Sequence, residues 1–220
     1  IDFDKDRSDR STYKLLGGSI GFYGSTLNTR QYATKGYLEK LIAQVFTGRE
    51  RFEPGNPQEG YSPSPQERQS WLQISYMKEA YHTMGPKFTL GWMAEALYSS
   101  KNFSENYTAT MMQAGEFAPT PHSKLMYNEA FRANQYVAAG IKPIYVLNDM
   151  FQFRTEFYGF TPIFPIKKNA LNKAYYGKAF SRFEYMGEVS VICHLPFGAI
   201  SAYVNHYSSP RREWNVGMTI

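Results

Sequence analysis

The sequence predicts an all-β fold, an antiparallel β-barrel that crosses a membrane. The first observation is strict alternation in residues 88–96 and 151–157. One face carries Phe88, Leu90, Trp92, Ala94 and Ala96, and then Phe151, Phe153 and Phe157. The other face carries Thr89, Gly91, Met93 and Glu95, and then Gln152, Arg154 and Glu156. Because successive strand side chains point to opposite sides, this pattern is typical of a barrel with lipid outside and a polar lumen.

Composition supplies the second observation. Aromatic residues make up 17% of the chain, which suits the aromatic girdles of a membrane barrel. The mean hydropathy of −0.48 does not conflict with this, because half of each barrel strand is polar. No run of about 18 apolar residues occurs, which excludes a transmembrane helix. On composition alone, a soluble sandwich or barrel with an aromatic core is an equal alternative.

Charge and cysteine content exclude two further classes of protein. The net charge is +5, but the basic residues are dispersed apart from Lys167-Lys168 and Arg211-Arg212, which argues against a nucleic-acid partner. The single cysteine, Cys193, excludes an internal disulfide framework. Because the sequence opens on Ile1-Asp-Phe without a signal peptide, we expect it to be a segment whose upstream part is missing.

We expect residues 1–220 to form a single domain of about ten strands. A first strand over 12–23 contains glycines that permit tight curvature. The stretch 37–46 would be a strand in a barrel, although its apolar spacing also fits a helix. Prolines make 51–69 a loop. Further strands are predicted near 70–82, 87–99, 106–116, 129–141, 144–159, 179–195, 199–207 and 213–220.

Turn residues separate these strands at 84–86, 118–121, 142–143, 196–198 and 209–210. Several strands reach the roughly 9–11 residues that a tilted bilayer crossing needs. Short turns and long loops should alternate along a membrane barrel, and from the turn at 142–143 onward they do. The turn at 84–86 breaks this alternation, which points to an error in the strand count or orientation of the first half.

The polar faces carry charges that predict a network in the lumen. Arg154 and Glu156 share one face, and Arg182 and Glu184 share another. Inside a barrel we expect such charges to pair across strands or to be satisfied by water. The candidate site residues are Arg132, Arg154, Glu156, Arg182 and Glu184. The alternative is a solvated sheet face, in which case another protein layer would have to cover the aromatic side.

Two further patterns favour a structural interpretation. Gly17-Gly-Ser-Ile-Gly21 matches G-x-S-x-G, so a serine esterase acting through Ser19 is an alternative function. However, polar residues precede the motif and a strand-like stretch follows it, whereas a nucleophile elbow joins a buried strand to a helix. The histidines share no metal-ligand spacing, so neither a metal nor another cofactor is expected; they are His82, His122, His194 and His206.

One segment, Thr26-Leu-Asn-Thr-Arg-Gln-Tyr-Ala-Thr-Lys-Gly36, is fairly specific. It resembles the C-terminal barrel of bacterial patatin-like phospholipases of the Bacteroidetes type, within the bacterial surface antigen superfamily. The similarity covers nearly the whole chain. It continues through Tyr13–Gly18, Gly48–Gly55, Pro119–Lys124, Asn128–Ala133, Arg154–Phe160 and Tyr203–Tyr207.

The resemblance implies an outer-membrane barrel of about sixteen strands, of which this chain would be the C-terminal portion. In patatin-type members, the barrel is thought to carry or export an upstream lipid-hydrolysing domain. The implied partners are that domain, membrane lipid or lipopolysaccharide, and the barrel-assembly machinery. The patatin domain, with its Ser/Asp dyad, is absent from this sequence. The superfamily's Val-Arg-Gly-Phe/Tyr lumen-loop motif has no literal match, and Arg132 is its nearest equivalent, expected to reach Glu156 or Glu184.

The sequence therefore predicts a non-catalytic barrel segment of the bacterial outer membrane, linked through the resemblance to secretion and lipid metabolism. Its role would be to anchor, and in a further step to translocate, an N-terminal patatin-like phospholipase domain. Two alternatives stay open at this point. One is the serine esterase acting through Ser19, and the other is a soluble β-barrel or sandwich that serves as a binding module.

Overall fold

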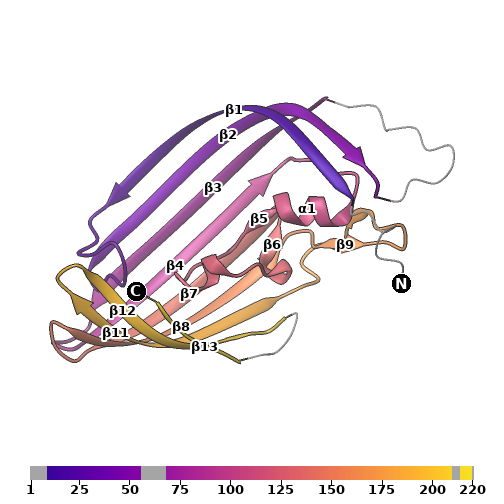
Figure 1. The fold of residues 1–220 in the computed structure, drawn as a ribbon. Helices are drawn as coiled ribbons and strands as arrows, with labels where there is room; N and C mark the ends of the chain where they lie inside the picture. Colours follow the sequence, from indigo (N-terminus) through magenta and orange to yellow (C-terminus); the bar gives the residue numbers. More distant parts are fainter. Residues whose placement is uncertain (1–8, 56–67, 210–213, 220) are drawn as a thin grey trace, which may run out of the picture.

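The computed structural model describes residues 9–55, 68–209 and 214–219. Its main feature is one nine-stranded antiparallel sheet whose strands pair with their neighbours in chain order (Figure 1). The strands are β1 (Arg10–Ser25), β2 (Gly36–Glu53), β3 (Arg68–Thr83), β4 (Phe88–Ser99), β7 (Gln135–Val146), β8 (Phe151–Pro162), β11 (Glu184–Leu195), β12 (Gly198–Tyr207) and β13 (Trp214–Thr219). Strands make up 64% of the structure, so the predicted all-β class is confirmed.

The segment 100–134 between β4 and β7, which we call the insert, lies on the concave side of this sheet (Figure 1). It contains α1 (Tyr107–Gln113), two 3-10 turns at Ser123–Leu125 and Glu129–Phe131, and a short ladder of β5 (Gly115–Glu116) with β6 (Arg132–Ala133). A hairpin of β9 (Ile166–Lys168) and β10 (Ala174–Tyr176) lies between β8 and β11 in the chain. In the described part of the chain, no helix is both long and apolar enough to cross a membrane.

Aromatic side chains join the insert to the sheet. Phe117 and Phe131 of the insert are each 2% exposed, and their rings lie 5.9 and 5.6 Å from the ring of Phe160 on β8. Tyr136 and Tyr207 pack against the same cluster from β7 and β12. Burying a ring of this size contributes about 1.5–3 kcal/mol. These contacts therefore hold the insert firmly against the wall of the sheet.

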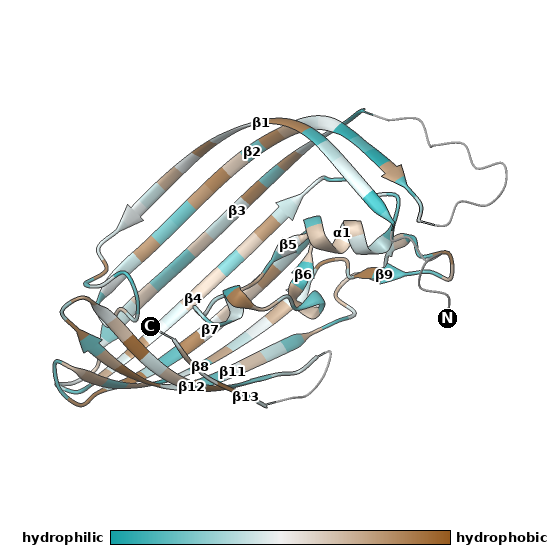
Figure 2. Cartoon of the chain, in the orientation of Figure 1, coloured by the Kyte–Doolittle hydropathy of each residue, from teal (hydrophilic) through white to brown (hydrophobic). Residues whose placement is uncertain are grey.

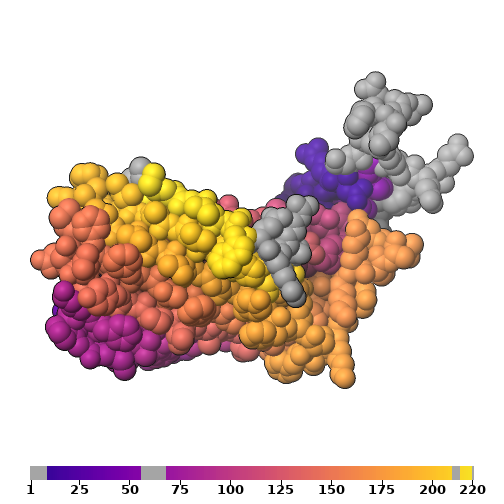
Figure 3. Space-filling model, turned by 90° about the horizontal axis from the view of Figure 1, so that it is seen from below, coloured from indigo at the N-terminus to yellow at the C-terminus, as the bar shows by residue number. Residues whose placement is uncertain are grey.

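The two faces of the sheet differ as the alternation predicts. The outward Phe88, Phe153 and Phe157 are 40–52% exposed, whereas the inward Gln152 and Arg154 are buried. Polar and apolar bands alternate along the strands in Figure 2. On the convex side the C-terminal strands form the molecular surface directly (Figure 3). The exposure of these rings means that no second layer of the described chain covers the apolar face.

The connections differ in length between the two ends of the sheet. At one end they span 26–35, 84–87, 147–150 and 196–197, and at the other they span 54–67, 100–134, 163–183 and 208–213. Three connections at the first end have two to four residues, and three at the other end have fourteen or more, which is the general pattern of membrane barrels. The exceptions are 26–35, with ten residues, and 208–213, with six. The turn at 84–86 did not fit the sequence-based count because 106–116 had been counted as a strand. Without that strand, the alternation runs through the whole chain.

The prediction of a strand over 106–116 is wrong, because most of this stretch forms α1. Asn106 caps the helix, and its Oδ1 accepts a hydrogen bond from the amide of Ala109 at 2.7 Å. Asparagine is favoured at this position because its side chain satisfies an amide that has no partner inside the helix. Met111 and Ala114 are buried on the inner side. The sheet therefore has nine strands rather than about ten.

Other predicted boundaries also differ from those in the structure. The predicted turn 142–143 lies inside β7, where the register with β8 is continuous except at Lys142 and Pro143. Proline has no amide hydrogen, so it interrupts pairing there without reversing the chain. The helical alternative for 37–46 is excluded, because these residues lie within β2. Of the predicted loop 51–69, residues 51–53 belong to β2, 68–69 belong to β3, and 56–67 lie outside the described residues.

Closure into a barrel is not found in this structure. Within the described ranges, β1 pairs only with β2 and β13 pairs only with β12. Each of these two strands therefore presents one row of backbone N–H and C=O groups that no other described strand pairs with. Such rows are templates for pairing with a further strand.

Gly140 of β7 tests how closely the strands pack. A Cβ at this position would lie 2.2 Å from Cδ1 of Tyr158 and 2.7 Å from the backbone oxygen of Phe157. We expect Gly140→Val to lower the free energy of unfolding by about 1–3 kcal/mol, because overpacking forces the neighbours to shift. Gly18→Val is the matched control, since a Cβ there meets nothing within 4 Å. Urea unfolding in detergent micelles measures both, and equal midpoints for the two variants would contradict this packing.

Candidate functional site

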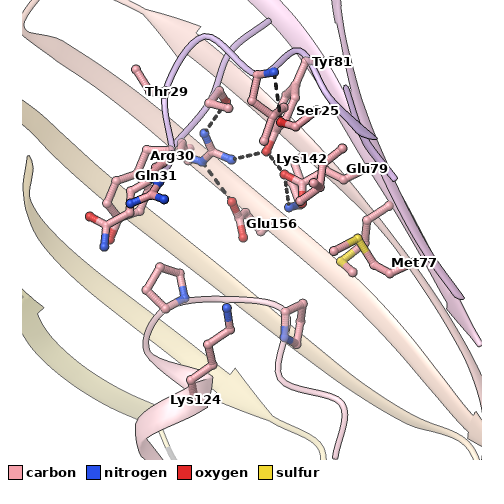
Figure 4. A pocket seen from close by; sticks show the side chains of 18 of the residues that line it. Ser25, Thr29, Arg30, Gln31, Met77, Glu79, Tyr81, Lys124, Lys142 and Glu156 are labelled. Carbon is pink, nitrogen blue, oxygen red and sulfur yellow. Dashed lines mark hydrogen bonds and ion pairs between the residues drawn. The ribbon is translucent and has the colours of Figure 1, made fainter. Parts of the chain in front are cut away.

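The concave side of the sheet encloses a cavity of about 930 Å³ between the wall, the insert and the loop 26–35. Figure 4 shows Lys124 of the insert and Glu156 of the wall pointing into this space from opposite sides. The other charged residues that line it are Arg30, Lys40, Glu79, Glu95, Lys142 and Arg154. Charges of both signs therefore face one partly open volume, and their pairing decides what the cavity can hold.

Arg154 and Glu156 form the centre of the charge network on the wall. Arg154 Nε donates to Glu156 Oε1 at 2.9 Å, and neither side chain is more than 7% exposed. The hydroxyl of Tyr158 donates to the other carboxylate oxygen at 2.5 Å. On β7, the strand next to β8, Lys142 Nζ lies 2.9 Å from Oε1 of Glu79, which belongs to β3. Buried charges are tolerated only when they are paired and hydrogen-bonded, and these groups meet that requirement.

The loop 26–35 is fixed to the same network. Arg154 Nη1 donates to the backbone oxygen of Ala33 at 2.9 Å, and Gln152 Nε2 donates to that of Tyr32 at 3.1 Å. Gly36 closes the loop with a φ of +90°, where a Cβ would lie 2.2 Å from the backbone oxygen of Thr26. Only glycine adopts this conformation without strain. The loop therefore turns inward and covers one end of the cavity.

Arg132 does not reach Glu156 or Glu184, so that prediction is wrong. Its Nη2 donates to Glu116 Oε2 at 2.7 Å within the insert, across the ladder of β5 with β6. Its Nη1 donates to the backbone oxygen of Ala114 at 3.2 Å, near the end of α1. Because Glu116 is the residue directly opposite Arg132 in that ladder, the local partner takes the guanidinium. Arg132 therefore holds the insert together rather than joining it to the wall.

Arg182 joins the insert to the wall. Its Nε donates to Glu184 Oε1 at 2.8 Å, and its Nη2 donates to the backbone oxygen of Ala130 in the insert at 2.9 Å. Ser208 donates to the second oxygen of Glu184 at 2.5 Å. Both Arg182–Glu184 and Arg154–Glu156 thus pair along the chain, two residues apart, whereas the sequence analysis expected pairing across strands.

A second buried group, centred on His122 of the insert, was not among the predicted site residues. His122 Nδ1 lies 2.9 Å from Glu188 Oε1 on β11, and its Nε2 lies 3.2 Å from Ser201 Oγ on β12. The imidazole also stacks on Tyr203, with ring centroids 3.4 Å apart. The hydroxyl of Tyr32 lies 2.7 Å from Ser201 Oγ. The only sequence signal was a histidine in a proline-rich loop, and its partners are 66 and 79 residues away.

Ser19 lies in the middle of β1, where residues 17–21 pair with β2 without a break, and its Cα partner is Gln44. The backbone there is extended, whereas a nucleophile elbow needs a sharp turn into a helix. Among the residues that the structure describes, no three His, Cys, Asp or Glu side chains gather closely enough to hold a metal ion.

Comparisons with protein-family models, with curated proteins and with solved structures gave no match. The resemblance to patatin-like phospholipase barrels therefore stays a prediction from the sequence, and function has to be argued from the geometry of the chain itself.

Arg154 offers a test of the interior network. We expect Arg154→Met to lower the free energy of unfolding by about 3 kcal/mol or more, because Glu156 loses its direct partner while still buried. Arg51→Met is the control, since the Arg51–Glu53 pair is 59% and 47% exposed and should contribute less than about 1 kcal/mol. Urea unfolding in micelles provides the measurement. Similar losses for both variants would show that the Arg154 pair does not behave as a buried one.

Proposed function

We propose that this chain is part of a bacterial outer-membrane β-barrel that anchors another domain of the same protein. The observation that carries the proposal is the division of each strand between an exposed apolar face and an interior lined with paired charge. Monomeric soluble proteins rarely expose contiguous apolar patches larger than a few hundred Å². Hydrocarbon is the environment that such a face requires, while the interior network requires protection from it.

The dimensions of the strands support this environment. β4, β7, β8 and β11 each contain twelve residues, and a tilted crossing of the bilayer core needs roughly 9–11. Near the end with the short turns, Phe88, Tyr145 and Phe153 are direct neighbours across three strands and all face outward. Such a row of rings is typical of the aromatic girdle at a membrane interface.

Orientation follows from the connections. Outer-membrane barrels keep short turns on the periplasmic side and long loops outside. The insert would then enter the lumen from the outer side, and the loop 26–35 would close the periplasmic end. A filled interior fits an anchor better than an open pore. Translocation of a patatin-like domain, which the sequence resemblance implies, would be a further step that requires the insert to move.

The lipid-facing surface, lipopolysaccharide and the barrel-assembly machinery are the partners that this proposal involves. The open rows of β1 and β13 would be closed by pairing with further strands, because an unpaired polar backbone is very costly in hydrocarbon. A soluble binding module is the weaker alternative, because it leaves the outward rings without cover. The Ser19 esterase is weaker still, because the backbone around Ser19 lacks the elbow.

The three tryptophans allow a direct test, because Trp71 lies inside, stacked on Phe46, while Trp92 and Trp214 face outward. Variants that keep one tryptophan, with Phe at the other two positions, would be folded into vesicles with brominated acyl chains. We expect strong quenching of Trp92 and Trp214 and little quenching of Trp71. Equal quenching of Trp71 and Trp92, or a full chain that stays monomeric and soluble without detergent, would contradict the membrane assignment.

Phe157, which is 52% exposed on the outer face, tests the energetics of the same assignment. We expect Phe157→Arg to lower folding stability in lipid vesicles by about 2–4 kcal/mol, because a lipid-facing guanidinium near the bilayer middle is costly. Lys14→Met on β1 is a control for a charge change away from this band. If Phe157→Arg left the unfolding midpoint in vesicles unchanged, this face would not be in contact with hydrocarbon.

A further inference from the structure

The group around His122 has the order of a catalytic triad. Glu188, His122 and Ser201 come from β11, the insert and β12, and follow one another at 2.9 and 3.2 Å. All three are at least 97% buried. A nucleophile within reach of an imidazole, which is itself oriented by a carboxylate, is the arrangement that activates serine in unrelated hydrolases. Among the described residues, two other buried serines of the wall, Ser190 and Ser99, form no hydrogen bond with a histidine.

One tautomer of His122 gives these hydrogen bonds the direction that catalysis needs. With its proton on Nδ1, His122 donates to Glu188 and leaves the Nε2 lone pair to accept from the hydroxyl of Ser201. Ser201 Oγ then accepts from the hydroxyl of Tyr32. Burial raises the pKa of Tyr32, so this phenol stays protonated and remains a donor at neutral pH. Each of the four groups therefore has one defined role in a single directed chain.

The imidazole is held rigidly. Its ring stacks on Tyr203 at an angle of 17°. Two hydrogen bonds between Thr120 and Ser123, at 3.0 and 3.1 Å, close the tight turn that carries it. A base that is fixed before the substrate arrives loses little entropy in the reaction. This rigidity comes from contacts that a simple link between insert and wall would not need.

We propose that Ser201 is the nucleophile of a serine ester-hydrolase site inside this barrel, with His122 as general base and Glu188 as its positioning residue. The activity goes beyond the anchoring role and is independent of the patatin-like domain. Oγ of Ser201 attacks the ester carbonyl while its proton passes to His122 Nε2. That proton then passes to the departing alkoxide, which leaves as an alcohol, and an acyl-serine remains.

Water completes the cycle. A water molecule adds to the carbonyl of the acyl-serine and gives a proton to His122 Nε2. The bond from Oγ to the acyl carbon then breaks, His122 returns the proton to Ser201, and a carboxylic acid is released. Atoms and charge balance with ester and water as the only reactants.

Tyr32 closes the site. Tyr32 lines the cavity, Ser201 does not, and the Tyr32 hydroxyl bonds to Ser201, so this residue lies between the cavity and the nucleophile. Its φ of +55° lies in the left-handed region, which costs a bulky residue on the order of 1–3 kcal/mol. Because Gln152 and Arg154 hold the backbone of this loop at Tyr32 and Ala33, access requires the Tyr32 side chain to rotate away, and a substrate carbonyl can then replace the phenol beside Ser201.

The cavity also indicates a substrate class. Arg30, Lys40 and Lys124 line it, and none of them forms an ion pair with a carboxylate of the described residues. The remaining cations, Lys142 and Arg154, are already paired with Glu79 and Glu156, and Glu95 is the third acid of the lining, so five cations face three acids. An ester that carries an anionic group would therefore be attracted into this space.

A fluorophosphonate probe tests the proposal, because it reacts with activated serines only. The full chain in detergent micelles should be labelled at Ser201, as identified by peptide mass spectrometry. Ser201→Ala should abolish labelling, and His122→Asn should slow it by about 10²–10⁴-fold. Tyr32→Ala should accelerate labelling because it uncovers the hydroxyl. Ser190→Ala is the matched control, since Ser190 is equally buried on the neighbouring strand and should leave labelling unchanged.

Three outcomes would overturn the proposal. One is a folded chain that is not labelled even as Tyr32→Ala, with folding judged by heat-modifiable mobility on gels. Another is labelling that survives Ser201→Ala. In the third, His122→Asn and Ser201→Ala only lower the unfolding midpoint, and the group is a structural link between insert and wall. Because labelling needs no bilayer, this test can fail while the tryptophan quenching still supports the membrane assignment. If Ser201 is labelled, the hydrolysis rates of nitrophenyl esters with and without a carboxylate would be compared, and we expect the ester with the carboxylate to react faster.

Discussion

The interior of this sheet is lined with charge, and the pairing of that charge is the constraint on which the rest of the structure depends. Arg154 shows why. Its guanidinium bonds to Glu156 on the wall, to the hydroxyl of Tyr81 and to the backbone of Ala33 in the loop 26–35. One buried cation thus joins β8 to the loop 26–35 and to β3, which is separated from β8 by β4 and β7 in the sheet. Without such partners, the desolvation of each charge would cost several kcal/mol, and an inward-facing row like this one could not fold.

Alternation along the strands was the part of the fold that sequence could predict, because a period of two follows directly from strand geometry. Two local features made the predicted strand boundaries wrong. A short amphipathic helix such as α1 resembles a strand over a few residues, and the decisive signal was the capping side chain of Asn106. Pro143 was interpreted as a turn, although proline is tolerated in a strand where a missing pair does little harm. Closure of the sheet depends on pairings that no local pattern encodes.

The candidate site also contains a part that a local sequence pattern predicts and a part that it does not. The shared face of Arg154 and Glu156 could be predicted, because they lie two residues apart on one strand. Their direct pairing, and that of Arg182 with Glu184, could not, because the pattern predicts which residues share a face and not which of them bond. The partner of Arg132 could not, because it depends on a two-residue ladder inside the insert. The contact of Tyr32 with Ser201 joins residues 169 apart, and the chain gives no hint of it. Long-range side-chain contacts of this kind depend on how the insert and the loop 26–35 pack against the sheet. That packing is determined by the whole fold and not by a local sequence pattern.

The two proposed roles place opposite demands on the insert. Glu188 and Ser201 belong to the wall, whereas His122 travels with the insert, so the triad exists only while the insert is seated. Passage of another domain through the lumen requires the insert to leave, and the imidazole would leave with it. The two proposed activities would therefore belong to different states of the sheet and its insert. The aromatic cluster of Phe117, Phe131 and Phe160 favours the seated state, because opening would expose all three rings to water in the lumen.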